Sequence, residues 1–413
     1  MQTSIHERFR NSREATVAES ILRACVHCGF CNATCPTYLE LGDERDGPRG
    51  RIYLIKQLLE TGNASERTRT HLDRCLTCRN CETTCPSGVR YGQLLDIGRG
   101  MLERDLRRSG LQSLKRRLIQ LIVPYPRRFG FILRIARLVG WLMPQSLRSK
   151  LPVAQARTAN PGRAEDNDRN MIVLDGCAQS VTTPATNDAT RRVLNRLGIA
   201  LRSAQGAGCC GALHYHLGEH ARGREFMRRN IDAWWPLIES GAEAIVITAS
   251  GCGSTVKEYG ELLADDPAYA QKARKISDMT LDVAEVLSRE DLDSLQLQPA
   301  DSKKALHCPC SLQHAQGLGG TLENLLQRAG LSLCASNESH LCCGSAGSYS
   351  LLQPRLSEQL KTRKLAALQA NAPDEILTAN VGCQLHLGSG TKLPVRHWIE
   401  AIDDALPGDD RSK

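Results

Sequence analysis

Residues 25–36 read CVHCGFCNATCP, and residues 75–86 repeat the pattern as CLTCRNCETTCP. Each copy spaces four cysteines as CxxCxxCxxxC and places a proline after the last one. The cysteines are Cys25, Cys28, Cys31 and Cys35 in the first copy and Cys75, Cys78, Cys81 and Cys85 in the second. Such short steps turn the chain tightly enough to aim successive sulfurs at one point, and the proline stops the turn from continuing as a helix. The pattern predicts two thiol-rich binding loops.

The same spacing occurs in bacterial ferredoxins, in which three close thiolates hold one [4Fe-4S] cube and the fourth ligates the other cube. We therefore expect two clusters with crossed ligand sets. One set is Cys25, Cys28, Cys31 and Cys85, and the other is Cys75, Cys78, Cys81 and Cys35. Structural zinc is the alternative, but its four ligands are commonly spaced as two separated pairs. The loops predict an electron conduit rather than a substrate-oxidising site.

The composition agrees with metal or redox chemistry. The 413 residues include 18 cysteines, with 53 Lys or Arg against 45 Asp or Glu, for a net charge of +8. The first twenty residues carry charges throughout and lack the apolar core of a secretory signal, so we expect no export to an oxidising compartment. Disulfides are then a poor explanation for the cysteines. No apolar run reaches the length of a membrane span.

Between the two motifs, GPRGRIYLIKQLLETGN at residues 47–63 predicts a helix. Pro48 stands near its start and Gly62 is a stop signal. Its apolar residues recur at helical spacing, at Ile52, Ile55, Leu58 and Leu59. A compact β-type ferredoxin has less room between its motifs. A helical ferredoxin module, as in the iron-sulfur subunits of succinate dehydrogenase, fits better.

The positive charge is concentrated in residues 106–164, which contain no acidic residue. Two amphipathic helices are expected there, separated by Pro124 and Pro126. Their apolar residues are Leu114, Leu118, Leu121 and Ile122, then Phe131, Ile132, Ile135, Leu138, Val139 and Leu142, with Trp141 beside them. Basic amphipathic helices either lie on an anionic membrane or dock on neighbouring modules or a partner subunit. No nucleic-acid-binding motif accompanies the charge, so no nucleic-acid partner is expected.

A second internal repeat accounts for eight further cysteines, because Cys310 follows Cys177 by 133 residues and a Cys-Cys-Gly follows each. The candidate ligands are Cys177, Cys209, Cys210 and Cys252 in one copy and Cys310, Cys342, Cys343 and Cys383 in the other. Each copy alternates strands and helices, which predicts a parallel sheet with the thiols converging at its carboxyl edge. They would hold a further metal or cluster, or remain reduced, buried and apolar. Cys308 and Cys334 fall outside the repeat and are predicted to be structural.

The two copies resemble the cysteine-rich CCG domain of heterodisulfide reductase subunits and lactate-utilisation proteins. That family's pattern ends in CxxC, whereas Thr255 and His386 stand at the last position here. Together with the ferredoxin motifs, residues 15–402 resemble the iron-sulfur subunits of bacterial glycolate oxidases. The expected fold is mainly α with α/β. Residues 1–105 would form an α-helical ferredoxin domain, 106–165 a basic connector, and 166–300 and 301–413 the two CCG repeats.

The resemblance implies a subunit of a flavin-dependent oxidoreductase complex. Partner flavoprotein subunits would carry FAD and oxidise glycolate, or also D-lactate, and this chain would pass electrons toward quinone rather than NAD or oxygen. It would lie on the cytoplasmic side, peripheral to the inner membrane, and would contain no catalytic residue. Alternatives are the equivalent subunit for glycerol 3-phosphate or lactate, or a thiol/disulfide reductase like heterodisulfide reductase. His214 and His216, beside the first Cys-Cys-Gly, are expected to be solvated or hydrogen-bonded.

Overall fold

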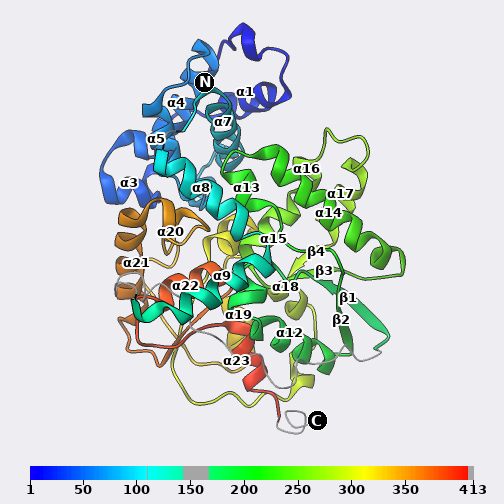
Figure 1. The fold of residues 1–413 in the computed structure, drawn as a ribbon. Helices are drawn as coiled ribbons and strands as arrows, with labels where there is room; N and C mark the ends of the chain where they lie inside the picture. Colours follow the sequence, from blue (N-terminus) through cyan, green and yellow to red (C-terminus); the bar gives the residue numbers. More distant parts are fainter. Residues whose placement is uncertain (109, 143–166, 408–413) are drawn as a thin grey trace.

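The computed structural model describes residues 1–108, 110–142 and 167–407. A helical N-terminal part lies at the top of Figure 1, and two α/β units with one four-stranded sheet each lie beneath it. The mainly α fold with duplicated α/β units confirms the predicted fold class. Among the described residues, no helix has the length and apolarity needed to cross a membrane.

The N-terminal part consists of helices around one apolar core. Its elements are η1 (Glu7–Phe9), α1 (Arg13–Ala24), α2 (Phe30–Ala33), α3 (Pro36–Leu41), η2 (Glu44–Asp46), α4 (Pro48–Thr61), α5 (Glu66–Asp73), α6 (Asn80–Thr83) and α7 (Tyr91–Asp105). The predicted inter-motif helix is α4, which begins with Pro48 and ends at Gly62 with φ of 69°. Glycine adopts this left-handed conformation without steric cost, so it ends the helix. α7 packs across α1, α4 and α5 and closes the core.

Two helices follow in the basic segment, α8 (Gly110–Ile122) and α9 (Pro126–Leu138), and then the short η3 (Gly140–Leu142). The break between α8 and α9 falls at the expected prolines. α9 packs against the first α/β unit and buries Leu133. Residues 143–166 of the predicted connector, together with the side chain of Leu142, lie outside the described residues.

The first α/β unit has a parallel sheet in the order β2-β1-β3-β4. Its strands are β1 (Arg169–Val173), β2 (Ile199–Ser203), β3 (Ile245–Ile247) and β4 (Thr280–Asp282). Its helices are α11 (Gln179–Thr182), α12 (Ala185–Arg196), α13 (Ala212–His216), α14 (His220–Glu239), α15 (Ser250–Lys257), α16 (Tyr259–Leu262), α17 (Ala270–Met279), α18 (Val283–Ser288) and η4 (Leu292–Leu295). Because helices cover both faces, the central strands are continuously apolar, as in the buried Ile-Val-Ile of β3.

The second unit repeats this arrangement with the parallel order β6-β5-β7-β8. Its strands are β5 (Lys304–His307), β6 (Leu333–Cys334), β7 (Glu375–Thr378) and β8 (Val395–His397). Its helices are η5 (Ser311–Ala315), α19 (Thr321–Arg328), α20 (Tyr349–Leu352), α21 (Pro354–Gln369), α22 (Val381–Gly388) and α23 (Trp398–Asp404).

The two units pack on each other reciprocally. α12 of the first contacts α23 of the second, and the corresponding α19 of the second contacts α18 of the first. One apolar core spans both units, with the fully buried Trp398 and Val193 among its members. Reciprocal contacts of this kind are expected when two similar units face each other across an approximate two-fold axis.

Candidate iron-sulfur and thiol sites

Four of the five thiols that line one cavity of the ferredoxin part form one of the expected ligand sets. They belong to Cys25, Cys28, Cys31 and Cys85, so three cysteines of the first motif meet the last cysteine of the second. The cavity encloses about 440 Å³, part of it open to solvent.

A neighbouring cavity of about 290 Å³ is lined by Cys35, Cys75, Cys78 and Cys81. Cys81 also borders the first cavity. Apart from Cys81, which borders both cavities, the eight thiols gather in the two crossed sets expected from the sequence, and their ligation of clusters stays a prediction. A [4Fe-4S] cube supplies a one-electron redox couple and takes four thiolates. The donors present, four thiols in each set, fit one cube in each cavity.

Both loops turn through left-handed residues at matched positions. His27 and Gly29 have φ of 60° and 88°, and fifty residues later Thr77 and Arg79 have 55° and 60°. Residues other than glycine adopt this region only where the surroundings impose it, and such strain is typical of functional sites. The turn aims backbone donors at sulfur, since the N–H of Thr77 donates to Sγ of Cys75 over 3.4 Å.

The two cavities differ in their exposure to solvent. Cys28 is exposed, and Val26 and Phe30 beside it are 71% and 63% exposed. All four cysteines of the second cavity are buried, and Leu76 and Cys78 pack in an apolar cluster with residues of the second repeat, so we call it the enclosed cavity. The first cavity is therefore the one that an external partner can approach.

The second cavity lies directly against the second repeat. Cys78 shares its apolar cluster with Cys342 and Tyr349. The hydroxyl of Tyr349 donates to the carbonyl of Arg74 over 3.0 Å. The amide of Asn80 donates to the carbonyl of His340 over 3.1 Å. These contacts fix the second repeat on the loop that lines the enclosed cavity.

A fully buried arginine borders the second cavity. Arg51 donates from Nε to the carbonyl of His71 over 2.8 Å and from Nη2 to Oγ1 of Thr37 over 3.0 Å. Nη1 has no hydrogen-bond partner among the described residues. Burial lowers the pKa of Arg51, but Cys75 and Tyr91 are among the groups that outweigh it and hold the pKa above its ordinary value. A permanent positive charge therefore stands beside the thiols.

In each α/β unit the four thiols form a row. In the first unit, Cys209 interacts with Cys177 and Cys210, and Cys210 interacts with Cys252. Interaction with Cys177 and Cys210, together with burial, places the pKa of Cys209 well above its ordinary value. Interaction with Cys209 and Cys252 holds the pKa of Cys210 well below its ordinary value.

The second unit has the corresponding row of Cys310, Cys342, Cys343 and Cys383. The sulfurs of Cys310 and Cys342 lie 3.8 Å apart. The thiols of each unit thus converge beyond the carboxyl ends of the strands, where parallel sheets bind ligands. That these rows bind a metal stays a prediction.

The histidines near the thiols take different roles. His216 Nδ1 pairs with Asp96 of α7 at 3.1 Å, as expected for a hydrogen-bonded histidine. His214 is buried and stacks on Phe226 with a ring separation of 5.1 Å, so it is not solvated. His386 bonds Ser357 through Nε2 at 3.1 Å. The sequence reading missed His307, which ends β5 and lies beside the second row of thiols. The repeat could have revealed it, because the corresponding position of the first repeat holds the apolar Leu174, and a histidine there is a departure that needs an explanation.

Two family models and a curated relative together match nearly the whole chain. A model of the cysteine-rich CCG domain matches residues 171–257 and 304–388, and a model of the 4Fe-4S dicluster domain matches residues 21–89. The glycolate oxidase iron-sulfur subunit of Escherichia coli strain K12 is 52% identical over 98% of this chain and 99% of that protein. The chain belongs to the family of glycolate oxidase iron-sulfur subunits.

Two further relatives show how far the similarity extends. A probable glycolate oxidase iron-sulfur subunit of Bacillus subtilis strain 168 is 29% identical over 93% of this chain and 92% of that protein. Lactate utilization protein A of Bacillus licheniformis is 30% identical over 52% of this chain and 91% of its own length. The family membership confirms the resemblance drawn from the motifs.

The crossed ligand sets predict how paired substitutions affect iron content. Cys35→Ala combined with Cys78→Ala removes two ligands of one cluster, so about four irons of the ferredoxin part remain. Cys35→Ala combined with Cys28→Ala disrupts both clusters, so those irons are lost. Iron analysis and spin counting of the reduced proteins measure the difference, with Cys334→Ala as a control that retains all iron. The opposite pattern would show that each motif ligates its own cube.

Arg51 is predicted to raise the reduction potential of the cluster in the enclosed cavity. Reduction adds one negative charge, which a buried guanidinium stabilises by about 1–2 kcal/mol. For one electron this is about 40–90 mV. Arg51→Gln, in a Cys28→Ala background that leaves only this cluster, should lower the potential by that amount in a redox titration. The exposed Arg45→Gln is the control. Equal potentials for the two variants would contradict the prediction.

Proposed function

We propose that this chain carries electrons from an FAD-bearing partner subunit, which oxidises glycolate to glyoxylate, toward the quinone pool. The observation that carries the proposal is the pair of adjacent thiol-lined cavities, one beside the exposed Cys28 and one lined by buried cysteines. A flavin accepts an electron pair from a hydroxy acid, whereas thiolate-bound cubes accept electrons singly. The chain's role is then to hold two such carriers side by side. The name of its E. coli relative supplies the substrate, glycolate.

Lactate is a second candidate substrate for the complex. Relatives named lactate utilization protein A match about half of this chain at up to 30% identity. The substrate would bind a partner subunit in either case, so the thiol cavities described here serve both candidates equally. Glycolate is favoured because the relatives that match nearly the full chain carry the glycolate name.

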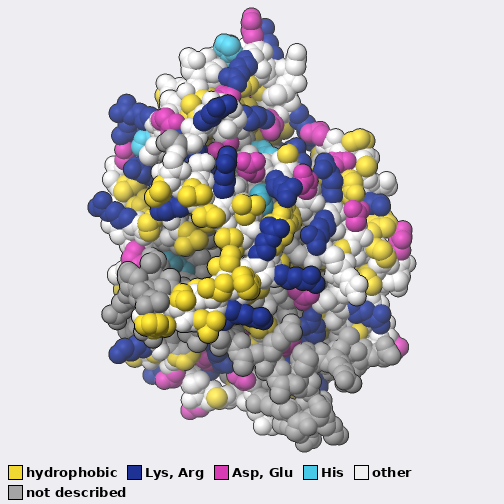
Figure 2. All heavy atoms as spheres, in the orientation of Figure 1, with side chains coloured by type: hydrophobic (Ala, Val, Ile, Leu, Met, Phe, Trp, Pro, Cys, Tyr) yellow, Lys and Arg dark blue, Asp and Glu magenta, His cyan; other side chains and the backbone are white. Residues whose placement is uncertain are grey.

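The basic segment supports a peripheral position on the cytoplasmic side of the inner membrane. Figure 2 shows hydrophobic side chains gathered over α8 and α9, with Lys and Arg beside them. We define the connector face by its exposed residues, which are Leu111, Leu114, Leu118, Leu121, Phe131, Ile132, Ile135, Leu138, Val139 and Trp141. Within the described residues these side chains are uncovered, although both helices also contact the chain's own domains, α9 through the buried Leu133.

Charge favours a lipid surface as the neighbour of the connector face. Lys115, Arg117, Arg127 and Arg134 are exposed on the same two helices, and no acidic residue accompanies them. Exposed basic residues near an anionic leaflet contribute about 1 kcal/mol each to binding. Apolar side chains including an aromatic ring enter the interface beside them. Contact with a partner subunit remains the competing explanation.

Electron delivery provides the direct test of the proposed function. In the purified complex with its flavoprotein subunits, we expect glycolate to bleach the cluster absorbance of this chain and to reduce quinone. Cys28→Ala or Cys78→Ala should lower quinone reduction at least 100-fold, because each interrupts the pair of carriers. Oxidation of glycolate with an artificial acceptor that takes electrons from the flavin should persist, and Cys334→Ala should behave as the unaltered protein.

Three results would contradict this function. Undiminished quinone reduction in both cluster variants would show that the electrons bypass this chain. Bleaching by lactate but not by glycolate would move the assignment to the second candidate. Purification without any flavoprotein, together with reduction of a disulfide substrate, would favour a thiol/disulfide reductase.

Flotation with lipid vesicles tests the connector face. Lys115→Glu combined with Arg117→Glu should lower binding to vesicles rich in anionic lipid at least tenfold, because two attractive charges become repulsive. The control is Arg10→Glu combined with Arg67→Glu, which makes the same charge change at exposed positions of the ferredoxin part. If the first variant floats as well as the control, the connector face meets a protein subunit instead.

A further inference from the structure

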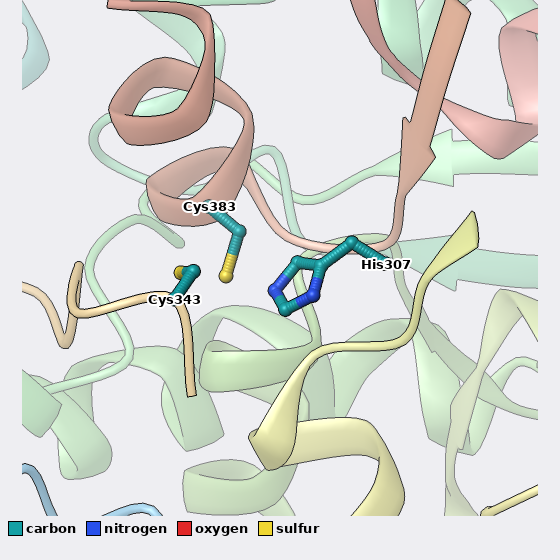
Figure 3. A group of neighbouring side chains, drawn as sticks. All are labelled: His307, Cys343 and Cys383. Atoms are coloured by element: carbon teal, nitrogen blue, oxygen red, sulfur yellow. The ribbon is translucent and has the colours of Figure 1, made fainter. Parts of the chain in front are cut away.

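His307, Cys343 and Cys383 form a compact group in the second repeat. His307 ends β5, Cys343 follows β6, and Cys383 lies in the first turn of α22. One ligand atom of each lies within 4.8 Å of the other two, and all three residues are buried. Figure 3 shows the imidazole of His307 directed toward the two sulfurs.

The imidazole of His307 is buried and makes no hydrogen bond within the described part of the chain. It is 1% exposed, and neither ring nitrogen has a hydrogen-bond partner among the described residues. A buried polar group without a partner costs about 1–3 kcal/mol. Thr378, which stands opposite His307 in the pairing of β5 and β7, also has a buried hydroxyl without a described partner. A ligand that used the ring nitrogen would remove part of this cost.

The first repeat shows that the fold itself does not need this histidine. Cys177 corresponds to Cys310, so Leu174 takes the place of His307. The strand register agrees: β1 pairs with β3 up to Val173 and Val246, and one residue further along Leu174 comes opposite Ile247, the position of Thr378. Leu174 and Ile247 are 2% and 1% exposed. Two apolar side chains thus fill in one repeat the space that holds two unsatisfied polar side chains in the other.

We propose that His307, Cys343 and Cys383 bind a single divalent thiophilic metal ion of the zinc class in the second repeat, and that the first repeat has no such site. An imidazole and two thiolates are preferred zinc donors, at about 2.0–2.1 Å and 2.3 Å from the ion. In a tetrahedral site these lengths place the donor atoms about 3.5–3.8 Å apart, which the group reaches by a small inward movement.

Compactness distinguishes this group from the ferredoxin cavities. A cube carries its thiolates on different irons, so they lie further apart than the ligands of one ion. Within the described ranges, the cysteines of the two cavities form no such compact trio, and the only other compact trio is Asp43, Asp46 and His71. Asp46 is already paired with Arg51 and Arg74, and Asp43 with Arg45, so both carboxylates of that trio are already neutralised.

Other cysteines lie near the trio and could supply a third thiolate to the ion. Cys342 adjoins Cys343, and its sulfur lies 3.8 Å from that of Cys310, so thiols are at hand for a fourth position. Two thiolates neutralise a divalent ion, and a third adds one negative charge. Lys364 supplies one positive charge, close enough to interact with Cys342, Cys343 and Cys383.

The ion would stabilise the fold and would not carry electrons. Zinc has no redox chemistry. The site adjoins Cys342, which packs with Cys78 of the enclosed ferredoxin cavity. By tying β5, the loop after β6 and α22 together, the ion would hold the surface of the second repeat against that cavity. The proposal is independent of which substrate the complex oxidises.

Metal analysis of the full-length chain with its clusters tests the site. We expect about one zinc per chain in addition to the cluster iron. His307→Leu should lower zinc at least tenfold and leave the iron unchanged, and it should fold because Leu174 fills the same position in the first repeat. His307→Cys should retain zinc, since it restores a donor. Cys210→Ala in the first repeat is the matched control and should also retain zinc.

Cobalt provides a second readout. After exchange of zinc for Co²⁺, the unaltered protein should show thiolate-to-cobalt charge transfer, and the His307→Leu protein should lose it. Loss of iron instead of zinc in His307→Leu would mean that the second repeat holds an iron-sulfur cluster and would overturn the proposal. So would zinc that persists in His307→Leu, zinc that disappears in Cys210→Ala, or a chain with no metal beyond its two clusters.

Discussion

The ferredoxin part depends on one constraint, the exchange of a thiol between its two motifs. Cys35 leaves the first motif to line the second cavity, and Cys85 leaves the second motif to line the first. Each loop completes its donor set only when the other loop is in place. The separation of the loops is set by close packing of α4 and α7, where a side chain at Gly98 would come within 2.9 Å of Ile55. Closely packed helices therefore hold the two loops at a fixed separation better than a flexible connection would.

Burial gives the two cavities different electrostatic environments. Water reaches the first cavity beside the exposed Cys28 and screens charges there. The second is enclosed by Arg51, by Tyr91, whose hydroxyl donates to Cys75 over 3.5 Å, and by the second repeat. Hydrogen bonds and charges act more strongly where water is excluded, and both tune a cluster's potential. The proposed route thus has an exposed end that a partner can meet and an enclosed end whose potential the chain controls.

The sequence predicts the parts of this protein that depend on local spacing. Three thiols of each set lie within seven residues, and α4 follows from apolar periodicity between Pro48 and Gly62. The role of His307 is not local, because it arises only when the register of β5 and β7 brings Cys343 and Cys383 to the end of one strand. Periodicity likewise predicts the apolar faces of α8 and α9, but whether another surface covers them depends on tertiary packing.

Duplication explains why the two repeats can differ at their thiols and still pack alike. Apolar side chains of α12, α18, α19 and α23 form much of the core that they share, whereas α15 and η5, beside the thiols, also meet through polar contacts such as the hydrogen bond between Ser250 and Ser311. The shared core needs only apolar side chains of suitable volume at those helices. Leu174 and His307 are not part of that shared core, so having leucine in one unit and histidine in the other leaves the shared core unchanged. Each thiol row must therefore be assigned its ligand from its own neighbours, since the common fold does not determine it.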